Sequence, residues 1–244
     1  ILFSCIHENS HSAVGYFFGR ELRKKLDVPI GLINTSWGGT PAEAWTKKSV
    51  LMADSGFKEL VEQYQYNLEN WDQVYGDYRE LIKELDKQRE QGKKVRRNPR
   101  PPVGLHSNKA PYVLYNAMVA PLLNYKIKGV VWYQGESNAQ RAKQYRRLFP
   151  AMIENWRTDW DQQNRFPFYF VQIAPHRSQN PYIREAQLIS HRKTPKTGMV
   201  VTTDIGDSVN IHPTNKQEVG RRLALWARAK TYGEDDLVYS GPLY

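Results

Sequence analysis

Short runs of β-branched and aromatic residues alternate with amphipathic segments along most of this 244-residue chain. We expect strands at 29–36, 127–133, 166–173 and 199–203, and helices at 12–25, 115–124, 140–156, 183–191 and 214–230. Strands that alternate with helices are typical of a mostly parallel sheet with helices on its faces. The sequence therefore predicts an α/β fold.

One stretch, 56–97, interrupts this alternation. It is strongly polar, lacks proline, and carries apolar residues at spacings of three and four. Those spacings predict amphipathic helix, with Gly76 as the candidate for a break, and a proline-rich loop follows at 99–111. We therefore divide the chain into the first part of an α/β domain, an inserted helical arm with its loop, the remainder of the α/β domain, and the start of a C-terminal extension. These parts cover 1–55, 56–110, 111–235 and 236–244.

The formal net charge of +10 raises the question of nucleic-acid binding. Much of the excess is local, because nine Lys or Arg lie between Lys83 and Lys109 against three acidic residues. Such a run is usually a solvated surface, so we predict no nucleic-acid partner. No apolar run approaches the roughly 20 residues that span a bilayer, which predicts no membrane partner. The single cysteine, Cys5, excludes an internal disulfide and a cysteine metal site within these residues. The oligomeric state is left open.

A polar segment follows the first expected strand, where paired glycines lead into Thr40 and Pro41. We expect Thr40 to cap a helix that begins at Pro41. Because helix N-termini offer free backbone N–H groups, Gly38 or Gly39 could donate to an oxyanion. Paired glycines also occur in ordinary tight turns.

The most informative segment, 131–139, reads Val-Trp-Tyr-Gln-Gly-Glu-Ser-Asn-Ala. An apolar run stops there at small and hydrogen-bonding side chains, at the sheet edge where ligands of open α/β sheets bind. The amide of Gln134 can donate to a developing oxyanion. Gly135 allows the backbone to approach a ligand closely. The alternative is an ordinary polar turn.

The third segment, 202–213, carries His212 in a loop after a strand that we expect to end at Asp204. We expect Thr214 to cap the last helix. A loop histidine near carboxylates suits general-base catalysis, because a carboxylate can fix its tautomer. His176 follows the preceding strand and is placed to line the same cleft. A surface histidine without a role is the alternative.

Together these segments resemble the SGNH-hydrolase superfamily, most closely its sialate O-acetylesterase branch. The similar motifs occur in the same order, at 12–20, 29–45, 132–138 and 211–213 with Lys216. The resemblance implies a three-layer α/β/α esterase that removes O-acetyl groups from sialic acid or related sugars. Such enzymes use a serine nucleophile, a histidine base and an oxyanion hole, with no metal and no cofactor. Similar bacterial enzymes are commonly exported, so the resemblance implies a periplasmic or secreted location.

Carried over by position, the resemblance makes His212 the base. It gives Gly38 or Gly39 a backbone N–H, and Gln134 a side-chain N–H, that bind the oxyanion. The candidates for contacts with substrate are Glu136, Asn138 and His176. An acetylxylan esterase of the same superfamily and a non-catalytic carbohydrate-binding relative remain as alternatives.

Two departures from the family pattern matter. Its Gly-Gln-Ser-Asn type motif is missing, and Ser4, Ser10 and Ser12 do not stand at a strand-to-turn junction with glycine partners. We therefore expect a fragment that begins after the nucleophile, lacks one strand of the sheet and is nearly inactive alone.

The second departure concerns the acid that orients the histidine. Many members place an aspartate three residues before it, where this chain has Val209. Asp207, Asp204 or a backbone carbonyl could take that role, and we favour Asp207.

Overall fold

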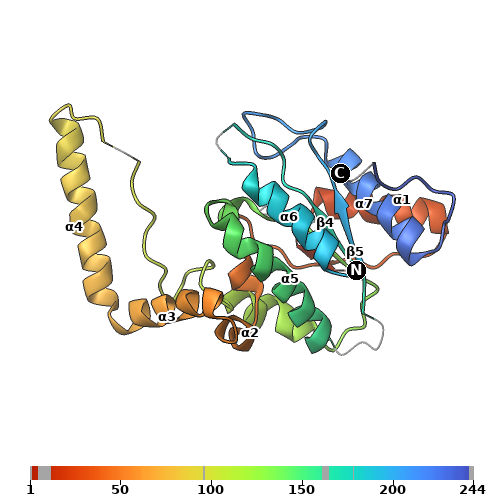
Figure 1. Ribbon diagram of the computed structural model, residues 1–244, viewed down its shortest axis with the longest axis horizontal. Coiled ribbons are helices and arrows are strands. Elements are labelled where there is room, and N and C mark those ends of the chain that lie inside the picture. Colours follow the sequence, from red (N-terminus) through yellow and green to blue (C-terminus); the bar gives the residue numbers. More distant parts are fainter. Residues whose placement is uncertain (1, 5–11, 96, 161–164, 178, 242–244) are drawn as a thin grey trace.

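A computed structural model describes residues 2–4, 12–95, 97–160, 165–177 and 179–241 (Figure 1). Its sheet has five parallel strands in the order β2-β1-β3-β4-β5. They are β1 (Leu2–Ser4), β2 (Ile33–Asn34), β3 (Val130–Trp132), β4 (Phe168–Val171) and β5 (Thr197–Val200). The strand order reverses at β1, which places a topological switch point between β1 and β3. Ligands of open α/β sheets bind outside the carboxyl ends of the strands at such a point.

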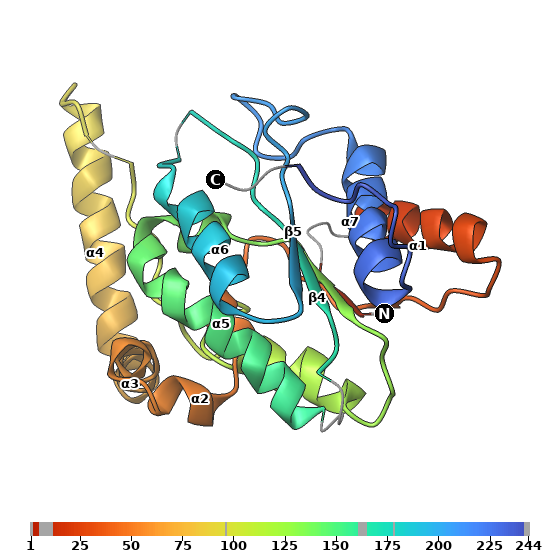
Figure 2. The same cartoon turned by 45° about the vertical axis from the view of Figure 1, so that its right-hand side comes forward.

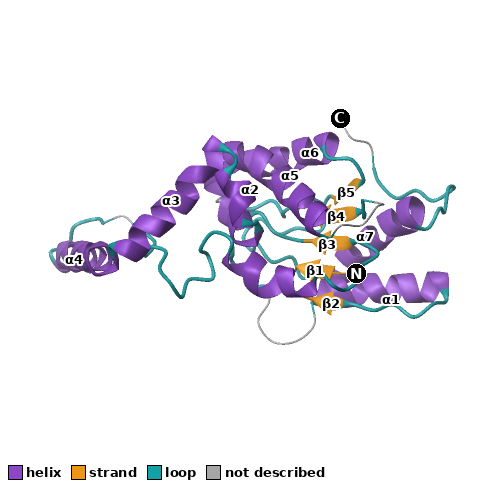
Figure 3. Ribbon diagram, turned by 90° about the horizontal axis from the view of Figure 1, so that it is seen from below, coloured by secondary structure: helices purple, strands orange, loops and turns teal. Residues whose placement is uncertain are grey.

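Helices cover both faces of this sheet, as Figure 3 shows. α1 (Ala13–Leu26) and α7 (Lys216–Thr231) lie on one face, and α5 (Ala142–Asp159) and α6 (Tyr182–Lys193) on the other. Successive strand residues point to opposite faces. Accordingly, Val131 packs in the core under α1 and α7, while Trp132 packs in the core under α5. The predicted three-layer α/β/α fold is confirmed.

The sheet differs from expectation in one strand, β1. We expected one strand to be missing, but Leu2–Ser4 pair with both β2 and β3. An extended segment in this position gives partners to backbone groups that a gap would leave unpaired. Ser4 therefore does end a strand, although no glycine flanks it in the sequence. Ser12 has a structural role, because its Oγ accepts the Gly15 N–H and caps α1.

Several predicted boundaries were wrong in detail. The strand expected at 29–36 contains only β2, and the helix expected at 115–124 is a π-helical turn (Tyr115–Val119) followed by a 3₁₀ turn (Ala120–Leu122). Pro121, which lacks a backbone N–H, interrupts the regular pattern there. Asn215, not Thr214, caps α7, since its Oδ1 accepts the Glu218 N–H.

The inserted arm consists of α3 (Ser55–Glu69) and α4 (Trp71–Glu90), which follow the short α2 (Lys48–Met52). The break between them lies at Asn70, not at Gly76, and both the backbone N–H and the side chain of Asn70 donate to the Tyr66 carbonyl at the end of α3. α3 buries Phe57 and Val61 in the main core. α4 has no buried residue and stands away from the sheet (Figures 1 and 2). None of the helices in the described ranges has the length and apolarity to cross a bilayer.

Candidate active site

Asn138 joins the first two predicted segments. Its Oδ1 accepts hydrogen bonds from the Ala42 N–H (2.9 Å) and from Gln134 Nε2 (2.7 Å), and its Nδ2 donates to Glu43 Oε2 (2.9 Å). All four residues are buried. Two loops nearly a hundred positions apart in sequence are thus locked together at the carboxyl edge of the sheet.

Glu43 is the charged member of this network. It is only 4% exposed, and its second carboxylate oxygen pairs with Arg141 at the start of α5. A buried carboxylate is tolerated when it is paired and hydrogen-bonded in this way. Glu43 therefore fixes Asn138 from one side and α5 from the other.

The Gln134 amide faces inward. Nε2 donates to the Thr40 carbonyl (3.2 Å) and to Asn138, while Oε1 accepts from the Tyr145 hydroxyl (3.1 Å). To donate to an oxyanion, the amide would have to exchange one of these bonds. Its role as an oxyanion donor stays a prediction.

The glycine turn before this network takes a different form from the one expected. Thr40 does not cap an α-helix: a single 3₁₀ turn (Ala42–Trp45) follows, and Thr40 Oγ1 bonds the Trp37 carbonyl and the Trp45 indole. The first N–H of that turn is already donated to Asn138, so the argument from a free helix N-terminus is wrong. Gly39 has a φ of +68°, which favours glycine, and is exposed. The backbone of Gly38 and Gly39 stays the predicted donor.

Gln187 on α6 was missed by the sequence reasoning. This fully buried side chain donates to the Gln134 carbonyl (3.0 Å) and the Val171 carbonyl (3.3 Å), and accepts the Ile173 N–H (3.0 Å). It thus ties the end of β3 to the end of β4. The position of Gln187 also requires a glycine at 135, because a Cβ there would lie 2.7 Å from Ile173 and 3.1 Å from Gln187. The missing Cβ of Gly135 thus makes room for the protein's own side chains, and an approach of its backbone to a ligand stays a prediction.

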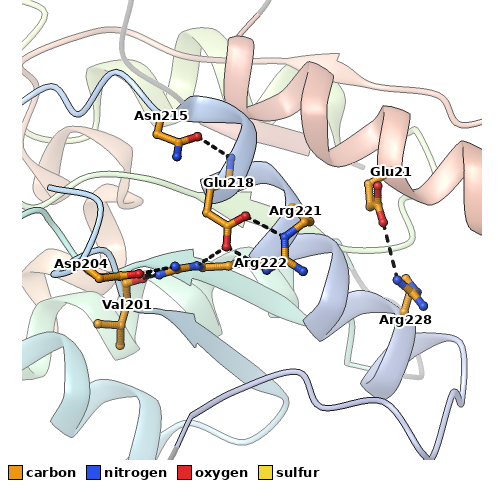
Figure 4. A network of polar contacts seen from close by, with 8 residues as sticks. All are labelled: Glu21, Val201, Asp204, Asn215, Glu218, Arg221, Arg222 and Arg228. Carbon is orange, nitrogen blue, oxygen red and sulfur yellow. Dashed lines mark hydrogen bonds and ion pairs between the residues drawn. The ribbon is translucent and has the colours of Figure 1, made fainter.

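Arg222 of α7 holds the beginning of the third segment, near Asp204. Figure 4 shows Arg222 between Asp204 and Glu218. Arg222 also donates to the Val201 carbonyl at the end of β5 (2.7 Å). Its hydrogen bonds lower the pKa of Asp204 to about 2. Both oxygens of Asp204 accept hydrogen bonds from Arg222, so any contact of this carboxylate with His212 would have to share an oxygen with the guanidinium.

Asp207 and His212 lie further along the same loop. Oδ1 of Asp207 accepts the Val209 N–H (2.8 Å), and the side chain is exposed. The His212 N–H donates to Asn210 Oδ1 (2.9 Å), and the imidazole is half-buried. These Asx-type bonds shape the loop. That Asp207 orients the imidazole stays a prediction.

Lys216, just after this loop, reaches the second segment. Its Nζ lies 5.4 Å from the centre of the Tyr133 ring. Burial raises the pKa of the Glu136 carboxyl above its ordinary value, and the attraction of the Lys216 ammonium only partly offsets that effect. The end of β3 and the start of α7 are therefore neighbours. His176, in the loop after β4, lies beside the third segment, because the Arg177 N–H donates to the Ser208 carbonyl (2.9 Å).

Comparison with known proteins identifies the family to which this chain belongs. A family model for carbohydrate esterases, described as sialic acid-specific acetylesterase, matches residues 106–228, which is half of the chain. The chain belongs to the sialic acid-specific acetylesterase family. The matched range contains the second and third segments and Gln187.

Named relatives extend the similarity over nearly the whole chain. The sialate O-acetylesterases of Homo sapiens and Rattus norvegicus are 37% and 36% identical, each over 95% of this chain, and it spans 41% and 45% of their lengths. A crystal structure of a carbohydrate acetylesterase from Xanthomonas citri superposes with a TM-score of 0.68 at 36% identity, over 94% of this chain and 43% of that one. This member of the acetylesterase family therefore spans less than half the length of the relatives it matches.

Proposed function

We propose that the protein carrying this chain is a carbohydrate O-acetylesterase that removes acetyl groups from O-acetylated sialic acids. The observation that carries the proposal is the interlocked edge itself: two of the polar segments, those after β2 and β3, are joined by Asn138 at the carboxyl edge of the sheet. The names of the relatives support the substrate class.

In the proposed reaction a serine Oγ attacks the acetyl carbonyl carbon while His212 accepts the serine proton. The backbone N–H groups of Gly38 and Gly39, with the Gln134 amide, bind the oxyanion of the tetrahedral intermediate. The intermediate collapses, the ester C–O bond breaks, and His212 returns the proton to the sugar oxygen. Water then attacks the acyl-enzyme by the same route and releases acetate.

The remaining roles follow from position. We propose that Asp207 orients the His212 imidazole, since Asp204 is engaged by Arg222. Glu136 and Asn138 are proposed to support or contact the substrate from the second segment. The nucleophile is proposed to be a serine outside this chain, in a Gly-Gln-Ser type motif, and export to the periplasm or the medium stays a prediction.

The test is acetate release by the full-length protein from acetylated sialic acid and acetylated xylan, side by side. We expect hydrolysis of the sialic acid ester and a loss of about 10² to 10⁴-fold in kcat for His212→Ala. His106→Ala, in the exposed loop after the arm, is the matched control and should retain full activity. Unchanged turnover by the His212 variant would contradict the role of His212 as the base. A preference for acetylated xylan would make the protein an acetylxylan esterase instead.

A second variant locates the nucleophile. Ser4 ends β1, an interior strand of the sheet, so Ser4→Ala separates a nucleophile within this chain from one outside it. We expect Ser4→Ala to keep its activity. Complete loss of acetate release, with an unchanged melting temperature, would make Ser4 the nucleophile instead.

A further inference from the structure

A pocket of about 380 Å³ lies at the carboxyl ends of β4 and β5. Its polar lining comes from the loop after β4, the first turn of α6 and the loop after β5. These residues are His176, Arg177, Gln179, Asn180, Arg184 and Ser208. The two loops lie side by side at the top of Figures 1 and 2. The pocket is thus separate from the Gln134–Asn138 network but on the same edge of the sheet.

The histidine loop forms one wall of this pocket. The Arg177 N–H donates to the Ser208 carbonyl at 2.9 Å. Gly206 packs so closely on Pro175 that a Cβ there would lie 2.8 Å from the proline ring. Since Ser208 is only four positions before His212, a molecule in the pocket would lie next to the loop that carries the proposed base.

Two of the residues that line the pocket are arginines. Three arginines outside the pocket have carboxylate partners: Arg141 with Glu43, Arg146 with Glu185, and Arg222 with Asp204. Arg177 and Arg184 line the pocket, and neither has an ion-pair partner in the described part of the chain. Two guanidinium groups without counter-charges in one concave site favour an anionic ligand. Arginine binds a carboxylate through two parallel hydrogen bonds.

We propose that Arg177 and Arg184 bind the carboxylate of an acidic sugar while its acetylated hydroxyl lies at the His212 loop. This subsite rests on the proposed function and assigns residues to the choice between acidic and neutral sugars. The volume is at the lower end of the roughly 300–1,000 Å³ typical of small-molecule sites, which suits a single sugar. Gln179, Asn180 and Ser208 supply groups that can bond sugar hydroxyls.

The experiment compares three acetyl esters with the full-length protein: O-acetylated N-acetylneuraminic acid, its carboxyl methyl ester, and 4-nitrophenyl acetate. Arg184→Ala and the double variant with Arg177→Ala should raise KM for the free acid by about 10-fold or more. KM for the methyl ester and kcat for 4-nitrophenyl acetate should change less than about two-fold. Lys193→Ala removes a positive charge from the far end of α6 and is the matched control.

The outcomes separate the subsite from the function. Equal losses on all three esters would mean that the arginines only support the fold, and unchanged KM for the acid would also overturn the subsite. If the wild-type protein hydrolyses none of the esters, the proposed function fails. The subsite is then tested directly by titrating N-acetylneuraminic acid and its methyl ester into the protein, observed by NMR. Binding of the acid alone, lost in the double variant, supports it, and equal binding or none overturns it.

Discussion

The two sides of the candidate site are built in different ways. On one side, the glycine turn and the Gln134–Asn138 segment are joined by buried hydrogen bonds between residues 94 to 96 positions apart. On the other, the loop 203–214 is largely exposed, and the backbone N–H groups of Val209 and His212 donate to side chains two positions earlier in the chain. A rigid edge suits the backbone donors proposed at Gly38 and Gly39, because preorganised donors need no reorganisation during the reaction, whereas the Gln134 amide must exchange one of its bonds. The histidine loop is held by Arg222 of α7 at Asp204 and by the loop after β4 at the Ser208 carbonyl.

Gln187→Leu tests the fixed side and should have the largest effect. Leucine fills a similar volume but leaves the Gln134 carbonyl and the Ile173 N–H buried without partners. Each orphaned group costs about 1–3 kcal/mol, so the free energy of unfolding should fall by about 3 kcal/mol in a urea titration. A shift of the Gln134 turn by about 1 Å should lower kcat roughly 100-fold.

The control for this variant is Gln63→Leu on α3. Gln63 is exposed and makes a local hydrogen bond to Asn67, so we expect a change below about 0.5 kcal/mol and no effect on kcat. Equal effects of the two glutamine variants would contradict the distinction between a fixed edge and an ordinary surface.

Asp207→Asn tests the other side through the imidazole. Asparagine keeps an oxygen for the Val209 N–H, so the turn should survive while the charge is lost. If the carboxylate orients His212, kcat should fall about ten-fold or more at an unchanged melting temperature. Asp207→Ala, which loses both the turn and the charge, gives the cost of loop distortion. Full activity in the asparagine variant would assign the orienting role to a backbone carbonyl.

Sequence reasoning succeeded where a pattern is local. Amphipathic spacing located α1, α5 and α7, and the ends of apolar runs located the polar segments. It failed where partners are distant in sequence. Nothing in the sequence around Gln187 indicates that it bonds the ends of two strands, and nothing around Glu43 indicates that it pairs with Asn138 and Arg141. The inward orientation of the Gln134 amide depends on Thr40, Asn138 and Tyr145 together, which no spacing rule specifies.

Arg222→Ala examines the anchor of the histidine loop. Hydrogen bonds from Arg222 hold the pKa of Asp204 near 2, and those from Arg221 and then Arg222 hold the pKa of Glu218 near 2. Both values lie below the ordinary ones. The stabilisation is therefore complete above about pH 4.5 and is lost as the pH falls toward 2.

The expected size of this effect is small. The Asp204 side chain is 61% exposed, so screening by water limits the pair to about 1 kcal/mol or less. Urea unfolding between pH 6 and 2.5 should show a shallower loss of stability in Arg222→Ala than in the wild-type protein. Parallel curves would mean that Arg222 does not anchor the loop through charge.

Neutralising the basic cluster beyond α4 should have the smallest effect. Lys93, Lys94, Arg97 and Arg100 are exposed and lie in the arm, which contributes no buried residue from α4 to the core. Changing all four to glutamine should leave the free energy of unfolding and the acetate-release rate within experimental error. The cluster is also the feature of the chain that would favour binding to nucleic acid. Each phosphate contact would then steepen the fall of log K with log salt concentration by about 0.9. We expect no retention of the wild-type protein on duplex DNA or RNA at about 50 mM salt. Salt-sensitive retention that the glutamine variant loses would instead make the arm a nucleic-acid-binding surface, separate from both sides of the candidate site.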